Sequence, residues 1–138
     1  MTPRHLAIAA ATVLTAAACS DSNSPTSDCP KPVTVTVSAG TKPAFSWTPA
    51  CKAYVVSVHS SSGLVWAMGF NDQNPAKANV ITSPVTYGDS LTIGDSLVKS
   101  FPAELTAGQT YTVFVLALTP VGTTTQMGKK DFVPEAAP

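Results

Sequence analysis

Segments that repeat with a period of two residues most limit what this chain can fold into. Residues 33–37 read VTVTV and residues 44–48 read AFSWT. Successive side chains of a β-strand point to opposite faces, so this period indicates strands. No segment of the mature chain shows the 3.6-residue apolar spacing of an amphipathic helix. Thr, Val and Ser are abundant and Pro and Gly punctuate the segments, so the sequence predicts an all-β fold.

Six or seven strands are expected. The third should place Tyr54, Val56 and Val58 on one face, and in the fourth Trp66 should alternate with Leu64 and Met68. The segments are Val33–Val37, Ala44–Thr48, Lys52–Ser60, Leu64–Phe70, Asn79–Thr82, Tyr111–Thr119 and a last strand within Thr123–Phe132, which should break near Gly128.

Residues 1–18 have the layout of an export signal. The cationic start Met1–His5 is followed by uncharged, mostly apolar residues up to Ala18, and then by Cys19. Such a run is typical of a secretory signal and is too short to span a bilayer. Ala16–Ala18 before Cys19 also resembles the bacterial lipobox, whose cysteine is lipidated and becomes residue one, although Ala16 replaces the usual Leu. Soluble secretion after ordinary cleavage, or a structural helix, are the alternatives.

The sequence divides into four parts. Residues 1–18 are predicted to be a signal peptide, and 19–31 the lipidated Cys19 with a flexible linker, because residues 20–28 read SDSNSPTSD. A single domain is expected over 32–134, with a tail at 135–138. Ser20, rather than Asp, follows the cysteine, which by analogy with enterobacterial lipoproteins suggests the outer membrane; a periplasmic or secreted location is the alternative.

The cysteine count agrees with a lipid anchor. Of three cysteines, Cys19, Cys29 and Cys51, an exported chain would leave one unpaired. Lipid on Cys19 leaves Cys29 and Cys51 for a disulfide. A hairpin centred on Gly40 would place position 29 opposite position 51, close enough to bridge. Two buried free thiols are the alternative, and a zinc site is not expected because the chain has no CxxC and one mature histidine, His59.

The charge of the chain excludes one class of partner. After cleavage about 120 residues remain, enough for one domain, with seven lysines against eight acids (7 − 8 = −1) and no arginine. Nucleic-acid binders normally carry a basic stripe with arginine. We therefore expect no nucleic-acid partner, and no phosphate loop, metal site or cofactor motif is present in the sequence.

The later strands resemble a known family. Leu105, Tyr111, Val113, Val115 and Ala117 match the Leu-to-Tyr and Y-x-V-x-V-x-A pattern of fibronectin type III domains. Upstream, FSWTP at 45–49 and YVVSV at 54–58 are similar to the second and third strands of that family. The resemblance implies an antiparallel β-sandwich of about seven strands, a core position for Trp47, and a Tyr111 hydroxyl bonded to the preceding corner. The cysteine pair and the long segment 71–100 depart from the family pattern.

Two copies of Gly-Asp-Ser-Leu, at 88–91 and 94–97, match the nucleophile block of an esterase family. A nucleophilic Ser90 or Ser96 would need a histidine base, and none follows His59. Gly-Asp-Ser also favours turns. We therefore interpret both copies as turns, and an esterase-like hydrolase is kept as an alternative function.

The outward face of the strand 111–119 is unusually apolar. It carries Phe114, Leu116 and Leu118, where a half-buried strand should be polar. Cover by the segment 71–100 is expected, through Ile81, Val85, Tyr87, Leu91 and Ile93. Otherwise these residues form a partner-binding surface. Trp66 lies in a strand that is often an edge in this architecture; core packing is expected for it, and a place in the partner-binding surface is the alternative.

Together these patterns predict a non-catalytic, lipid-anchored protein of the bacterial cell envelope. Its fibronectin type III-like domain would bind a protein or glycan ligand or act as a scaffold. A purely structural spacer is the other alternative.

Overall fold

The computed structural model describes residues 32–70, 78–90, 96–99 and 104–136. The predicted signal peptide (1–18) and linker (19–31) lie outside these residues and stay predictions. Within the described residues the chain forms eight strands: β1 (Thr34–Val37), β2 (Ala44–Thr48), β3 (Val55–Ser60), β4 (Gly63–Phe70), β5 (Val85–Thr86), β6 (Ser96–Lys99), β7 (Tyr111–Leu118) and β8 (Thr124–Phe132).

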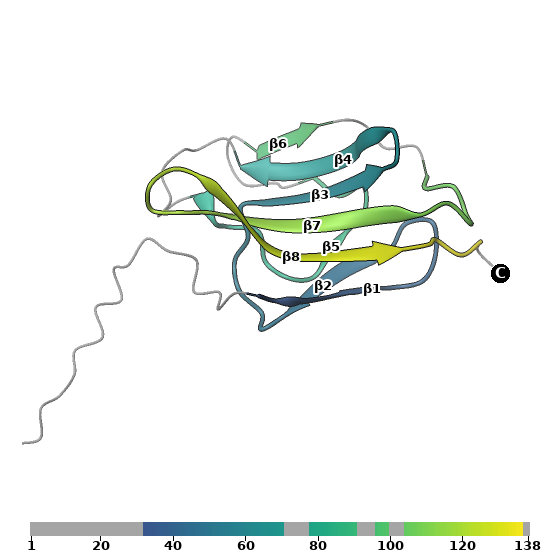
Figure 1. Cartoon of the computed structure of the whole chain (residues 1–138), viewed down its shortest axis with the longest axis horizontal. Helices are drawn as coiled ribbons and strands as arrows, with labels where there is room; N and C mark the ends of the chain where they lie inside the picture. Colours follow the sequence, from purple (N-terminus) through teal and green to yellow (C-terminus); the bar gives the residue numbers. More distant parts are fainter. Residues whose placement is uncertain (1–31, 71–77, 91–95, 100–103, 137–138) are drawn as a thin grey trace, which may run out of the picture.

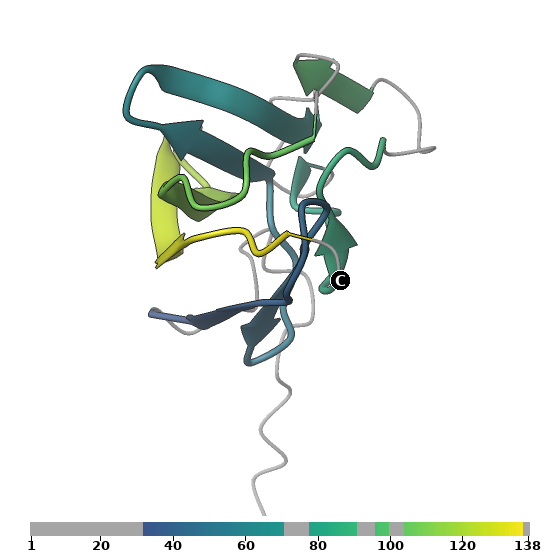
Figure 2. The same cartoon turned by 90° about the vertical axis from the view of Figure 1, so that its right-hand side faces the viewer.

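The strands form two antiparallel sheets that face each other across one core (Figures 1 and 2). One sheet has the order β1-β2-β5 and the other the order β6-β4-β3-β7-β8. The predicted all-β antiparallel sandwich is confirmed. The sequence predicts about seven strands, and the structure has an eighth because β6 extends the five-stranded sheet beyond the edge of β4.

The first hairpin has the predicted strands in a different register. A hairpin centred on Gly40 would pair position 33 with Trp47, whereas the structure pairs Val35 with Trp47. The Ser38 amide donates to the Ala44 carbonyl (2.9 Å) across the loop, in which Gly40 has a φ of 100°. Because the shift is two residues, each strand keeps the same inward face. The predicted opposition of positions 29 and 51 relied on the Gly40-centred register.

Strand β3 begins at Val55, later than predicted. Tyr54 does not share the inward face of Val56, because the chain bends there and buries the tyrosine in a separate small cluster with Ala78 and Leu118. The Tyr54 amide still donates to the Leu116 carbonyl (2.8 Å).

The predicted strand 79–82 is reduced to one isolated bridge, in which Ile81 pairs with Ala53. The edge of the three-stranded sheet is formed instead by the short β5, where Val85 pairs with Phe45. Pro84, which has no amide proton to donate to a neighbouring strand, lies between the bridge and β5.

A bulge in β4 changes the predicted alternation. Val58 pairs with Trp66, but His59 pairs with Leu64, so Val65 is an extra residue on β4. Trp66 and Met68 point into the core as predicted, whereas Leu64 is 49% exposed. The extra residue explains the difference: before Val65, the β4 side chains that would face the core face outward instead.

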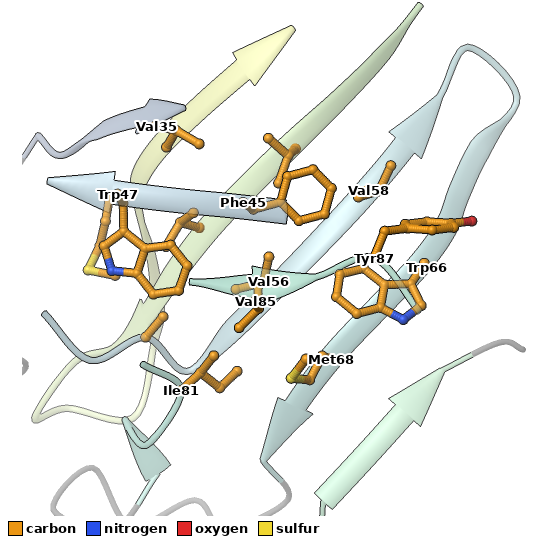
Figure 3. Packing of buried hydrophobic residues seen from close by; sticks show 14 of the residues in the cluster. Val35, Phe45, Trp47, Val56, Val58, Trp66, Met68, Ile81, Val85 and Tyr87 are labelled. Atoms are coloured by element: carbon orange, nitrogen blue, oxygen red, sulfur yellow. The ribbon is translucent and has the colours of Figure 1, made fainter. Parts of the chain in front are cut away.

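The core lies between the sheets and is built around large side chains (Figure 3). Burying one such side chain contributes about 1.5–3 kcal/mol relative to leaving it exposed. The largest fully buried side chains include Trp47, Trp66, Phe45, Met68, Ile81, Leu118, Met127, Val56, Val58, Val113 and Val115.

Strand β8 carries the predicted irregularity near Gly128. Val115 pairs with Gly128 and Leu116 with Gln126, so Met127 is an extra residue there. Its carbonyl accepts a hydrogen bond from the Val33 amide (3.0 Å), which links β8 to the start of β1. Gly128 packs so closely that a Cβ would lie 2.8 Å from the Val33 carbonyl oxygen. The glycine therefore allows the two sheets to meet at this corner.

The two ends of the sandwich carry different loops. We call the end at which β1 begins the proximal end; it also carries the segment 49–54 and the β7–β8 hairpin loop at 119–123. The distal end carries the loops at 38–43, 61–62, 87–90 and 104–110 and the residues after β8. In Figure 1 the proximal end lies at the left and the described C-terminal residues lie at the right.

Candidate interaction surface

Tyr111 has the structural role that the sequence predicts. Its hydroxyl accepts a hydrogen bond from the Thr106 amide (3.1 Å) and donates to Gln109 Oε1 (3.1 Å). Its ring is buried and stacks on Phe132 at a centroid distance of 5.9 Å. The side chain thus ties the start of β7 to the preceding corner.

Trp47 also has a structural role. Its indole Nε1 donates to the Cys51 carbonyl (2.7 Å), and its amide donates to Ser83 Oγ (3.0 Å). The side chain lies in the core, as the family resemblance implies (Figure 3). These bonds fix the chain as it leaves β2 and begins to cross toward the second sheet.

Trp66 does not lie on a partner-binding surface. The side chain is fully buried between Phe45 and Tyr87, at centroid distances of 6.2 and 5.5 Å (Figure 3). Its Nε1 has no hydrogen-bond acceptor among the described residues. Burial raises the pKa of the neighbouring Tyr87 hydroxyl above 10.0, and Tyr111 raises it further. The core packing expected of Trp66 is confirmed, whereas its alternative role on an exposed edge is wrong, because β6 pairs with β4 and the residue points inward.

Leu118 is likewise covered. It is almost completely buried against Tyr54 and Ala78. Asn79 fastens this cover: its Nδ2 donates to the Leu118 carbonyl (3.0 Å), and its Oδ1 accepts from the Leu118 amide (2.9 Å). Intramolecular cover by the 71–100 segment is therefore found at Leu118, through residues other than those predicted.

The residues predicted to supply that cover lie elsewhere. Ile81, Val85 and Tyr87 belong to the main core between the sheets. Leu91 and Ile93 fall outside the described residues, so their part in the prediction is untested.

Phe114 and Leu116 remain partly exposed on the outer face of the five-stranded sheet. Leu116 pairs with Val55, which is also partly exposed, and Phe114 pairs with Ser57. We call Phe114, Leu116, Val55 and His59 the outer-face cluster. It retains two of the four residues predicted as a binding surface.

His59 is the residue of this face that the sequence prediction did not include. Its ring meets Phe114 edge to face at a centroid distance of 5.2 Å and an interplanar angle of 85°. Its Nε2 forms a hydrogen bond with Ser57 Oγ (3.2 Å). The sequence could have revealed the bond between Ser57 and His59, because residues two apart on a strand share a face.

A second side-chain bond joins strands β7 and β8. Thr112 Oγ1 donates to Asp131 Oδ1 (2.6 Å).

The first Gly-Asp-Ser-Leu copy forms a turn over the residues that the structure describes. Gly88 has a φ of 91°, and Asp89 Oδ2 accepts from the Thr86 amide (3.3 Å). Ser90 is exposed after this turn, and no described contact joins it to His59. In the second copy the predicted turn is not found over Ser96 and Leu97, which begin strand β6 and pair with β4; residues 91–95 and the side chain of Ser96 lie outside the description.

One of the three cysteines lies among the described residues. Cys51 is partly buried beside the core. Cys19 and Cys29 lie outside the described residues, which therefore contain no cysteine pair. The Cys29–Cys51 pairing and the lipidation of Cys19 stay predictions.

Metal-binding clusters and membrane-spanning helices are both absent from the described ranges. They contain no group of three or more His, Cys, Asp or Glu side chains able to hold a metal ion. No helix in them is long and apolar enough to cross a membrane.

Comparison with known proteins identifies no relative. The chain matches no protein-family model, no curated protein and no solved structure. The fold class defined by the structure, a two-sheet antiparallel β-sandwich, is therefore the finest classification that is established.

Proposed function

We propose that this chain is a non-catalytic, lipid-anchored protein of the bacterial cell envelope, whose fibronectin type III-like sandwich binds a partner through the outer-face cluster. The observation that carries the binding role is that Phe114 and Leu116 stay partly exposed on a sheet face expected to be polar. The anchor rests on the sequence of residues 1–19 alone.

The family resemblance is supported by features of the sandwich. The Tyr111 hydroxyl is bonded to the Thr106 amide, and Trp47 is buried between the sheets. Strand β2 lies between β1 and β5, while β3 lies between β4 and β7. Greek-key sandwiches share such a division of strands and such a tyrosine. The added β6 departs from the family pattern, and so would the proposed pairing of Cys29 with Cys51.

The outer-face cluster has the composition of a contact surface. Aromatic side chains are enriched in protein interfaces and charged side chains are depleted at their centres. Phe114 and His59 supply aromatic rings, Leu116 and Val55 supply aliphatic area, and Lys129 lies at the rim beside Phe114 in the β7–β8 register. A protein is the favoured ligand because the cluster lies on a sheet face, and a glycan is the other outcome of the test.

The binding role is tested with a charge placed in the cluster. Wild-type chain, Leu116→Lys and a control, Thr34→Lys, are each immobilised and exposed to purified peptidoglycan and to envelope proteins. Thr34 is an exposed residue of the other sheet, so the control adds the same charge elsewhere. We expect Leu116→Lys to lose a ligand that wild type and Thr34→Lys retain. Equal retention by all three would contradict binding through this face and favour a structural spacer.

The anchor and the absence of catalysis need separate tests. Cys19→Ala should move the protein from the detergent phase to the aqueous phase of a membrane extract, and no movement would contradict lipidation at this residue. For the alternative hydrolase, generic ester cleavage is measured for wild type and for the Ser90→Ala, Ser96→Ala double variant. Activity that the double variant loses would overturn the non-catalytic proposal.

A further inference from the structure

The three large apolar side chains that are most exposed among the described residues lie at different ends of the sandwich. Val121 is 82% exposed at the tip of the β7–β8 hairpin, at the proximal end. Leu64 and Val133 are 49% and 52% exposed at the distal end. The hairpin holds its shape through bonds within the loop, because the Thr119 amide donates to the Thr123 carbonyl (2.8 Å) and the Gly122 amide to the Thr119 carbonyl (2.9 Å).

The described carboxylates gather at one of these ends, whereas the described lysines are spread over the sandwich, with Lys42 at the distal end and Lys99, Lys129 and Lys130 within strands. All four described carboxylates lie toward the distal end: Asp89 follows β5, Glu104 pairs with Lys42 (3.5 Å), Asp131 lies at the end of β8, and Glu135 follows it. The described proximal segments carry Lys52 and no carboxylate. Asp72 and Lys77, which carry opposite charges, fall outside the description.

The length of chain before the sandwich limits which end can approach the anchor. Residues 19–31 number thirteen, and a flexible chain of thirteen residues has a root-mean-square length of about 20 Å. The sandwich is as long as the eight-residue β7, about 27 Å. Val33 is fixed at the proximal end by its bond to Met127. The anchor therefore brings the proximal end to the bilayer more readily than the distal end.

We propose that the proximal end of the sandwich rests on a phospholipid surface, with Val121 as its apolar contact and the distal loops directed away from the membrane. This inference rests on the proposed lipid anchor at Cys19. An anionic leaflet repels carboxylates, so the distal position of all four described carboxylates favours this orientation over the reverse. The outer-face cluster would then stand beside the membrane, open to a partner in the envelope.

The orientation is tested with a tryptophan at each end. Full-length Val121→Trp, Leu64→Trp and Val133→Trp chains are lipidated in cells and reconstituted into vesicles of zwitterionic and anionic phospholipid that carry brominated acyl chains. The wild-type signal of the buried Trp47 and Trp66 is subtracted. Unfolding midpoints equal to that of wild type verify that each exposed replacement is tolerated.

We expect the emission of Val121→Trp to shift to the blue on reconstitution and to be quenched by brominated lipid, while Leu64→Trp and Val133→Trp stay unquenched. Equal quenching at both ends, or none for Val121→Trp in a chain that mass spectrometry shows to be lipidated, would overturn the orientation alone. A chain without acyl groups that fails to join the vesicles would overturn the proposed anchor, and the orientation with it.

Discussion

Replacing Asn79 with alanine should destabilise the sandwich strongly, although the residue is not part of a strand. Its amide group forms two hydrogen bonds with the backbone of Leu118, which is almost completely buried. Each lost bond removes about 1 kcal/mol, and a buried group left without a partner costs about 1–3 kcal/mol. The variant leaves both the amide and the carbonyl of Leu118 without a partner, so we expect the free energy of unfolding to fall by about 2–4 kcal/mol. This corresponds to a fall in Tm of roughly 10–25 °C.

The loss is measured by urea unfolding and calorimetry of the chain from residue 20 onward. Gln126→Ala is the control, because this exposed strand residue should cost less than about 0.5 kcal/mol. Asn79→Asp adds a specific signature: its protonated carboxyl can both donate and accept, so stability should recover as pH falls. A loss below about 0.5 kcal/mol for Asn79→Ala would refute the conclusion that Asn79 fastens the cover over Leu118.

Three further predictions concern stability. Gly128→Ala should lower the free energy of unfolding by about 1–3 kcal/mol, because its Cβ would lie 2.8 Å from the Val33 carbonyl oxygen. At Gly69 the nearest atom is a Val55 methyl at 3.1 Å, so Gly69→Ala should lower it less in the same urea unfolding experiment. Tyr111→Phe should cost about 1 kcal/mol by loss of the bond from the Thr106 amide, and an unchanged urea midpoint would argue against a role for that hydroxyl. The raised pKa of Tyr87 means that the unfolded chain loses its proton first, so stability should fall as pH rises past 10; Tyr87→Phe should reduce that fall, and identical pH profiles would contradict the prediction.

Local alternation and turn residues were sufficient to predict much of this fold. Residues 44–48 and the strand that begins at Tyr111 were predicted almost to the residue, because their period of two coincides with an inward apolar face. Gly128 was recognised as a break, since glycine within a strand often marks a bulge or a close approach. The corner bond of Tyr111 followed from the family resemblance.

The errors come from features that a period of two cannot reveal. The bulge at Val65 changes which β4 residues face inward, and nothing in the local sequence indicates it. Cover of Leu118 was predicted through Ile81, Val85 and Tyr87, which lie in the main core instead. The cover comes from Tyr54 and Ala78, and their contact with Leu118 cannot be read from a local period because they are distant from it in sequence. The strand of Trp66 was expected to be an edge, but β4 pairs with β6, and this pairing depends on a segment whose course the pattern does not predict.

The account depends most on export and anchoring, and intact mass spectrometry of the protein from the membrane fraction, before and after reduction, tests both directly. We expect a chain that starts at Cys19, carries acyl groups and gains two hydrogen atoms on reduction, as a Cys29–Cys51 disulfide requires. A full-length chain that retains residues 1–18, with three thiols open to alkylation, would contradict the account.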